Sequence, residues 1–231
     1  NATGLSCSTC IEAGELASDS VTEPKLDVVD RLICMQAQVS LEHYRRGQLD
    51  GDEFAKITRA AAKIAEAPIW IDDRTGQSIR DIRASALLMA QEHVIVLWVL
   101  DYIQKIKTSH SRDEKRYEQL AHASSEIKDI ARDANLAAVI LSQINTAGEV
   151  AGTKEILDHA DTIIAPCNRE EEVEPKEQGR FALRILKQRN GNADHDIAVK
   201  FNKPLVRFEN YDPEPGDLIP KEAARYPKPG A

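Results

Sequence analysis

The most constraining feature of this sequence is an unbroken apolar run that ends in an acidic residue. Residues Val94–Leu100 are all apolar, most are β-branched or leucine, and Asp101 follows directly. Such a run predicts a strand buried on both faces, as in a parallel sheet covered by helices. Ala137–Leu141 and Thr162–Ala165 are shorter runs of the same kind. Because helical segments alternate with them, we expect an α/β fold with a mostly parallel sheet and helices on both faces.

The segments between these runs show helical spacing of apolar residues. Ser78 and Asp81 also fit a capping box at a helix start. The expected helices are 1–16 (ending near Gly14), Lys25–Val39, Asp50–Ala67, Ser78–His93, a segment ending near Asn135, and Ile156–Ala160.

Short strands are expected on both sides of this central region. Beyond the apolar runs, they are Ser20–Thr22, Ile69–Asp73, Phe181–Leu186, Ile197–Phe201 and Leu205–Phe208. Turn sequences separate the last three, which predicts C-terminal β-hairpins. We expect residues 1–210 to form one domain and the proline-rich residues 211–231 to form an extended tail.

Composition excludes several classes of protein. The formal net charge is −8 and aromatic residues make up 5%. These values argue against a generally basic nucleic-acid binder and against base stacking on an aromatic platform. The longest apolar run is far shorter than the roughly 20 residues that span a bilayer, so no membrane partner is expected. The four cysteines include the CxxC of Cys7 and Cys10, without a second pair at zinc-site spacing. We therefore expect a cytoplasmic protein without a structural metal.

Polar groups at the ends of expected strands are candidate ligands, because parallel α/β sheets bind ligands at that edge. Asp101 is suited to hold magnesium through water beside nucleotide phosphates, or it caps a loop. Gln143 is suited to sense a phosphate or orient a water, or it is an ordinary strand terminus. Lys187 and Arg189 share a side-chain parity and suit a transferring phosphoryl group, unless they form a solvated hairpin tip.

Five motifs in order resemble one family. They are Leu-Asp-Tyr-Ile-Gln (100–104), Leu-Ser-Gln-Ile-Asn (141–145), Ala-Asp-Thr-Ile-Ile (160–164), Lys-Gln-Arg-Asn-Gly (187–191) and Arg-Phe-Glu-Asn (207–210). Over roughly Thr22–Asn210 the chain resembles the C-terminal RecA-like motor domain of the DnaB family of replicative DNA helicases. The resemblance implies a homo-hexameric ATPase that uses ATP and Mg²⁺, encircles single-stranded DNA and unwinds duplex. It also implies primase and a helicase loader as partners, in a bacterial or phage-infected cell.

The same resemblance implies roles for individual residues. Asp101 would be the magnesium-associated carboxylate, and Gln143 would couple the nucleotide state to a DNA-binding loop. Lys187 and Arg189 would reach the ATP of a neighbouring subunit and stabilise charge on its γ-phosphate.

Further roles are implied for residues outside these strand ends. Glu23 would polarise the attacking water, with Glu12 and Glu15 as rivals on expected helix positions. The resemblance places Arg207 and Phe208 near the nucleotide base. It places Lys105, Lys107 and Arg112 on a segment that lines the DNA channel, unless that segment is only a solvated loop and helix start.

The sequence departs from the family at three places. The phosphate-binding motif GxxxxGK[ST] does not occur, the segment after Gln143 is short, and the strand before Glu23 is short. We expect an abbreviated sequence as the reason. The alternatives are a non-catalytic paralogue that binds a helicase ring or loader, and a RecA-like recombinase-type ATPase.

Overall fold

The computed structural model describes residues 15–20, 24–107, 116–143, 154–168, 180–193 and 195–211. The chain divides into two compact units. Residues 1–28 and 66–160 belong to the first unit, and residues 29–65 and 161–231 belong to the second. Within the described residues, no helix is both long and apolar enough to cross a membrane.

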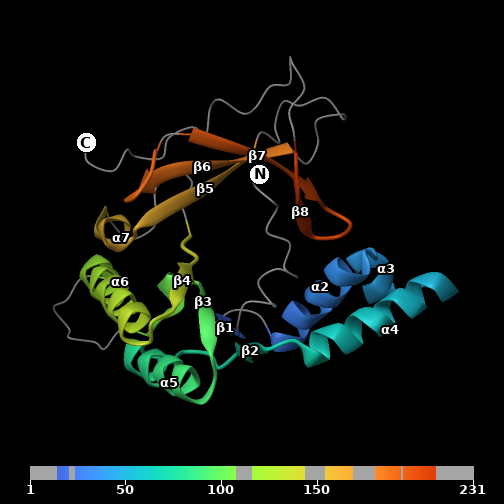
Figure 1. Ribbon diagram of the computed structural model, residues 1–231, viewed down its shortest axis with the longest axis horizontal. Coiled ribbons are helices and arrows are strands. Elements are labelled where there is room, and N and C mark those ends of the chain that lie inside the picture. Colours follow the sequence, from blue (N-terminus) through green and yellow to red (C-terminus); the bar gives the residue numbers. More distant parts are fainter. Residues whose placement is uncertain are drawn as a thin grey trace. The chain divides into compact units, whose positions relative to one another are not determined.

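A parallel four-stranded sheet forms the centre of the first unit (Figure 1). Its strands are β1 (Glu15–Ser20), β2 (Ile69–Asp72), β3 (Ile95–Asp101) and β4 (Ala137–Ile140), in the order β2-β1-β3-β4. Its other elements are α5 (Ile79–Glu92), η1 (Ile103–Lys105), α6 (Arg116–Asp133) and α7 (Lys154–His159). Alternating strands and helices thus give the expected mostly parallel α/β arrangement.

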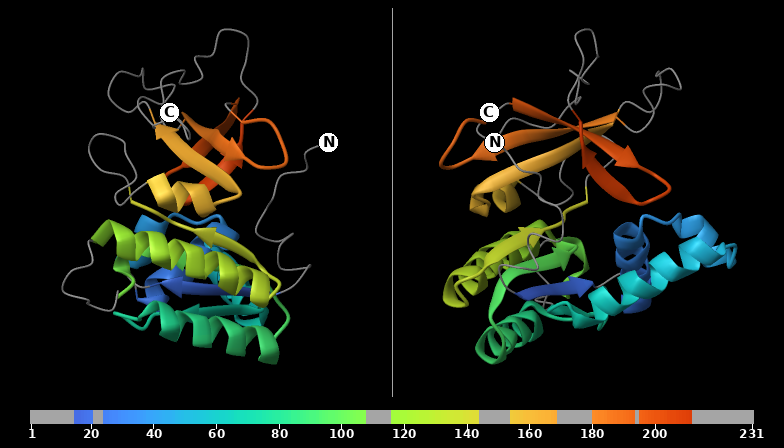
Figure 2. Two further views of the ribbon diagram at one scale, coloured as in Figure 1. Left: turned by 90° about the vertical axis from the view of Figure 1, so that its left-hand side faces the viewer. Right: turned by 45° about the vertical axis from the view of Figure 1, so that its right-hand side comes forward.

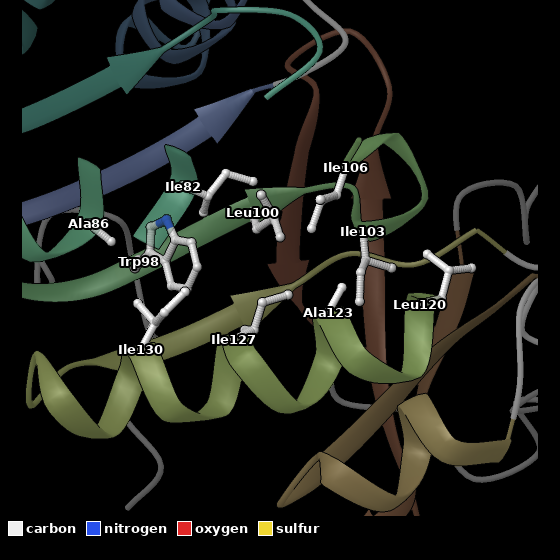
Figure 3. Close-up of a cluster of buried hydrophobic side chains, with 10 residues drawn as sticks. All are labelled: Ile82, Ala86, Trp98, Leu100, Ile103, Ile106, Leu120, Ala123, Ile127 and Ile130. Atoms are coloured by element: carbon white, nitrogen blue, oxygen red, sulfur yellow. The ribbon is translucent and has the colours of Figure 1, made fainter. Parts of the chain in front are cut away.

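The core of the first unit lies between one face of this sheet and two helices. Trp98 and Leu100 project from that face of β3 and are almost completely buried. Ile82 of α5 and Ile127 and Ile130 of α6 belong to the same buried cluster (Figure 3). Both helices therefore pack on the face of the sheet that carries Trp98 and Leu100.

The N-terminal strand differs from its sequence-based expectation. Glu15 and Leu16 were expected in a helix, but they begin β1, which pairs in parallel with β2 and β3. The expectation was wrong because the segment Glu-Leu-Ala-Ser-Asp-Ser has little strand pattern of its own. Hydrogen bonding to β2 on one side and to β3 on the other stabilises this segment as a strand. The helix expected before Glu15 lies outside the described residues.

The second unit contains a helical part and an antiparallel sheet. The helices are most of α2 (Lys25–Ala37), α3 (Leu41–Arg46) and α4 (Gly51–Glu66). They enclose a cluster built around Cys34, Val39 and Ile57, and burial raises the pKa of the Cys34 thiol to about 11. The backbone N–H of Leu41 donates to the carbonyl of Pro204, 3.0 Å away, which joins the two parts.

Four strands form the sheet of the second unit (Figure 2). They are β5 (Thr162–Asn168), β6 (Arg180–Gln188), β7 (His195–Asn202) and β8 (Arg207–Asn210), and each neighbouring pair is antiparallel. The hairpins expected near the C-terminus are therefore confirmed. The expectation that Thr162–Ala165 is buried on both faces was wrong. It lies in edge strand β5, where Ile164 is 54% exposed.

Candidate functional site

The carboxyl ends of neighbouring strands meet at one edge of the parallel sheet. Asp101 ends β3 and pairs in register with Ser20, the last residue of β1. Its side chain is partly exposed, which suits a carboxylate that meets a ligand. Asp72 ends β2, which pairs with the other side of β1, where Asp72 is in register with Asp19. Side-chain hydrogen bonds from Arg74 hold the pKa of Asp72 below its ordinary value.

Gln143 reaches the same edge from the adjacent strand. After β4 the chain stays hydrogen-bonded to the end of β3 and to the segment that follows it, because Leu141 N–H donates to the Leu100 carbonyl at 3.0 Å and Ile103 N–H donates to the Leu141 carbonyl at 3.1 Å. The side-chain amide of Gln104 then pairs with the main chain of Gln143. The structure therefore brings Asp101 and Gln143 to one edge, as the sequence predicts. The Gln143 residue is exposed there.

Two lysines lie on the segment that leaves this edge. Lys105 is exposed at the end of η1, with its Nζ 5.9 Å from the centroid of the Tyr102 ring. The Lys107 N–H donates to the Gln77 carbonyl at 2.8 Å, which fixes its backbone. The Lys107 side chain passes Gly76 so closely that a Cβ there would lie 2.8 Å from its Cε. Both lysines that are expected to contact DNA are therefore exposed on the short segment that follows Asp101.

The expected phosphate-contacting cations lie in the second unit. Lys187 is on β6 opposite Ile163 and is partly buried. The strand ends at Gln188, so Arg189 lies in the following turn and the parity argument does not extend to it. The Arg189 N–H donates to the Asp161 carbonyl at 2.9 Å, and its guanidinium donates to Asp161 Oδ1 at 3.0 Å. Arg189 is 68% exposed and Asp161 58%.

Arg207 and Phe208, which are expected near a nucleotide base, are neighbours on β8 and point to opposite faces of the sheet. Arg207 donates to Glu209 Oε1 at 2.8 Å, and this hydrogen bond is the main cause that lowers the pKa of Glu209. Phe208 instead packs against Phe201, with ring centroids 4.9 Å apart, and is 49% exposed. Because adjacent strand residues point to opposite faces, Arg207 and Phe208 do not form one contiguous surface.

Several expected site residues lie outside the part of the chain that the structure describes. They are Glu12, Glu23 and Arg112. Within the described ranges, no group of three or more His, Cys, Asp or Glu side chains could hold a metal ion by itself. A single carboxylate such as Asp101 fits a magnesium ion whose other ligands are water and phosphate oxygens.

Two residues of the site were missed by the sequence analysis. Gln104 and Asp161 both lie inside the recognised motifs, but no local pattern names their partners. Gln104 bonds to a residue 39 positions away, and Asp161 to one 28 positions away. Their place in the motifs was the only signal that could have drawn attention to them.

Comparisons with known proteins agree with the motifs. A family model described as the DnaB-like helicase C terminal domain matches residues 6–210. The replicative DNA helicase DnaB of Mycobacterium leprae is 32% identical over 204 residues, which cover 83% of this chain and 33% of that protein. The replicative DNA helicase DnaC of Bacillus subtilis is 26% identical over 198 residues, covering 80% of this chain and 43% of that protein. The chain thus spans less than half the length of these curated relatives.

Solved structures show the same fold. One solved ATPase domain superposes with a TM-score of 0.77 at 18% identity, covering 87% of this chain and 76% of that one. A DnaB-like replicative helicase, solved in a study of its interactions with primase, gives a TM-score of 0.78 at 19% identity. That match covers 87% of this chain and 51% of the helicase chain.

Proposed function

The chain belongs to the family of DnaB-like helicase C-terminal domains, and on this premise we propose that it is the motor part of an ATP-dependent replicative DNA helicase. We propose that residues 1–210 form the motor domain and that ATP is hydrolysed at subunit interfaces of a homo-hexameric ring. The ring moves along single-stranded DNA and unwinds duplex. Primase and a helicase loader are its proposed partners, in the cytoplasm of a bacterial or phage-infected cell.

The observation that carries this proposal is the shared edge of Asp101 and Gln143. A nucleotide phosphate bound at that edge meets a carboxylate from β3 and an amide from the chain after β4. Magnesium, when bound, neutralises phosphate charge there. Asp101 would hold the cation through water, and Gln143 would contact the phosphate and carry its state to the segment that follows.

Arg189 supports the second half of the proposal, in which one subunit completes the site of another. Its guanidinium is on an exposed turn and is held by an exposed carboxylate. Exposed ion pairs contribute roughly 0–1 kcal/mol. Arg189 can therefore exchange Asp161 for a γ-phosphate at little cost, and a guanidinium binds phosphate in a stronger, bidentate geometry. We assign Lys187 the same target, Glu23 the attacking water, and Arg207 and Phe208 the surroundings of the base.

This proposal has two alternatives. One is a paralogue that joins a helicase ring or its loader without hydrolysing ATP, and the hydrolysis measurement below distinguishes it from a motor. The other is a recombinase-type ATPase, which is disfavoured because the family match and the Lys-x-Arg-Asn-Gly turn both indicate the helicase.

Mixed rings of two inactive variants test the shared site. In the intact protein, Arg189→Ala is expected to lower DNA-stimulated hydrolysis by on the order of 10³ or more, while an ATP analogue still binds. Asp101→Asn is expected to be inactive in its own site. In a head-to-tail interface, one subunit supplies Asp101 and its neighbour supplies Arg189. When equal amounts of the two variants are mixed, about one quarter of the interfaces therefore keep both side chains. Hydrolysis should then recover in part.

The control is Arg132→Ala, which removes a similarly exposed arginine paired with Asp129 at 2.8 Å. It should leave hydrolysis unchanged. Mixed rings that assemble but show no recovery contradict the shared site. Rings of the unaltered protein that assemble but neither bind nor hydrolyse ATP favour the non-catalytic paralogue.

A further inference from the structure

We propose that Gln104 is a positioning residue that holds Gln143 in register with the Asp101 edge and so couples bound nucleotide to bound DNA. This inference rests on the proposed function and adds a residue to it. Gln104 lies in η1, three residues after Asp101, and is partly buried. Its side chain spans the gap between the two segments that leave the carboxyl edge of the sheet.

Three hydrogen bonds define the contact. The Gln104 Oε1 accepts from the Gln143 backbone N–H at 3.2 Å. The Gln104 Nε2 donates to the Gln143 carbonyl at 3.3 Å and to Ser142 Oγ at 2.8 Å. A primary amide has both a donor and an acceptor on one planar group, so it satisfies both main-chain groups of Gln143 at once.

This amide extends the sheet beyond its last paired residues. Regular pairing of β3 with β4 ends at Leu100 and Ile140. Two main-chain bonds continue it, from Leu141 N–H to the Leu100 carbonyl and from Ile103 N–H to the Leu141 carbonyl. The Gln104 side chain then acts as a substitute for a peptide group. The backbone of Leu141 and Gln143 and the side chain of Ser142 are thereby tied to residues 100–104, the segment that contains Asp101.

These bonds fix the position of the Gln143 backbone. When the side chain of a residue binds phosphate, the contact can shift the following segment in a defined way only if the backbone of that residue is held in place. Without the Gln104 amide, the Gln143 N–H and carbonyl lose their described partners, and the segment after Leu141 can move independently of Asp101. Nucleotide contact and DNA contact would then no longer be linked.

The first test measures the ratio of ATP hydrolysis with single-stranded DNA to hydrolysis without it, in the intact protein. Gln104→Met keeps the length of the side chain and removes the amide, so it separates hydrogen bonding from packing. We expect the ratio to fall at least fivefold. In a Gln143→Ala background the same substitution should cause no further fall, because Gln104 acts through Gln143. Gln91→Ala, an exposed glutamine on α5, should retain the full ratio.

An unchanged ratio in Gln104→Met overturns the inference, and so does a further fall in the double variant. A second measurement does not depend on catalysis. Hydrogen exchange of the Gln143 amide should be about fivefold faster in Gln104→Met, as expected for the loss of one net hydrogen bond. If the unaltered protein hydrolyses no ATP, the proposed function fails by itself. Faster exchange then still supports the positioning contact, and unchanged exchange overturns it.

Discussion

At the scale of single residues, the ion pair between Arg184 and Asp196 links the two central strands of the second sheet. The guanidinium Nε lies 2.7 Å from Asp196 Oδ1, and a second nitrogen lies 2.7 Å from Oδ2. The two side chains are only 22% and 19% exposed. Bidentate geometry and burial together make this pair stronger than the exposed pairs on the helices.

The pair predicts a specific dependence of stability on pH. Hydrogen bonding from Arg184 lowers the pKa of Asp196 in the folded chain. The stabilisation is therefore complete above the ordinary carboxyl pKa and is lost as the pH falls below it, through the lowered folded value. Asp196→Asn should destabilise by about 1–3 kcal/mol at neutral pH. Urea unfolding from pH 7 down to pH 3 should show a shallower acid loss in this variant than in the unaltered protein.

Asp52→Asn, at an exposed position in the first turn of α4, is the matched control and should keep the original acid loss. An Asp196→Asn curve parallel to that of the unaltered protein would show that the pair does not govern acid stability.

Residue positions at the sheet edge could be predicted from the sequence, but their contacts could not. Asp101 and Gln143 each follow an apolar run, and the rule that parallel strands end at one edge brings them together. The Gln104 and Asp161 bonds depend on which loops lie side by side, which no local pattern records. Alternation along a strand already implied that the Arg207 and Phe208 side chains point to opposite faces, although the motif resemblance assigned both to one site.

At the scale of elements, helix α3 shows how a short helix is fixed at both ends. The Ser40 side chain accepts from the His43 N–H, and Gly47 ends the helix in the left-handed region with φ of 66°. The Gly47 N–H donates to the carbonyls of residues in the last turn. A left-handed residue at this position satisfies carbonyls that the helix leaves open.

Two glycines near this helix give opposite predictions. A Cβ would meet nothing within 4 Å at either Gly47 or Gly51, so only backbone strain separates them. Gly47→Ala should lower the free energy of unfolding by about 1 kcal/mol, because alanine disfavours a positive φ. Gly51→Ala, in the first turn of α4, should be neutral or stabilising by up to about 0.5 kcal/mol. Chemical unfolding of both variants decides this, and equal effects would exclude the capping explanation.

Helices and strands with a clear apolar or capping pattern in their own sequence could be predicted, whereas strands that depend on pairing with neighbouring strands could not. The capping box of Ser78 and Asp81 is present at the start of α5, and the apolar run before Asp101 forms β3. In contrast, β1 is polar and owes its order to strands on both sides. Strand β5 was assigned the wrong environment because an apolar run does not reveal whether its neighbour is parallel or antiparallel.

At the scale of the whole molecule, the charge of the chain limits where it can contact DNA. The formal net charge is −8, so attraction over the whole surface is excluded and phosphate contacts must be local. Lys105 and Lys107 are exposed beside the edge that holds Asp101 and Gln143. Two cations therefore lie within three residues of Gln104, which bonds to Gln143.

Reversing these two charges tests that placement in the intact protein. Removing one lysine–phosphate interaction should reduce the slope of log affinity against log salt by roughly 0.7 for single-stranded DNA. The double variant Lys105→Glu with Lys107→Glu should therefore bind single strands more weakly, with a slope flatter by about 1.4 if both lysines bind phosphate. Fluorescence anisotropy at several salt concentrations gives both quantities. Lys56→Glu with Lys63→Glu changes the net charge equally on exposed positions of α4. Because the proposal places no phosphate contact on α4, this variant should leave the slope almost unchanged. If the α4 variant no longer binds while the Lys105 and Lys107 variant still does, DNA contacts a different surface.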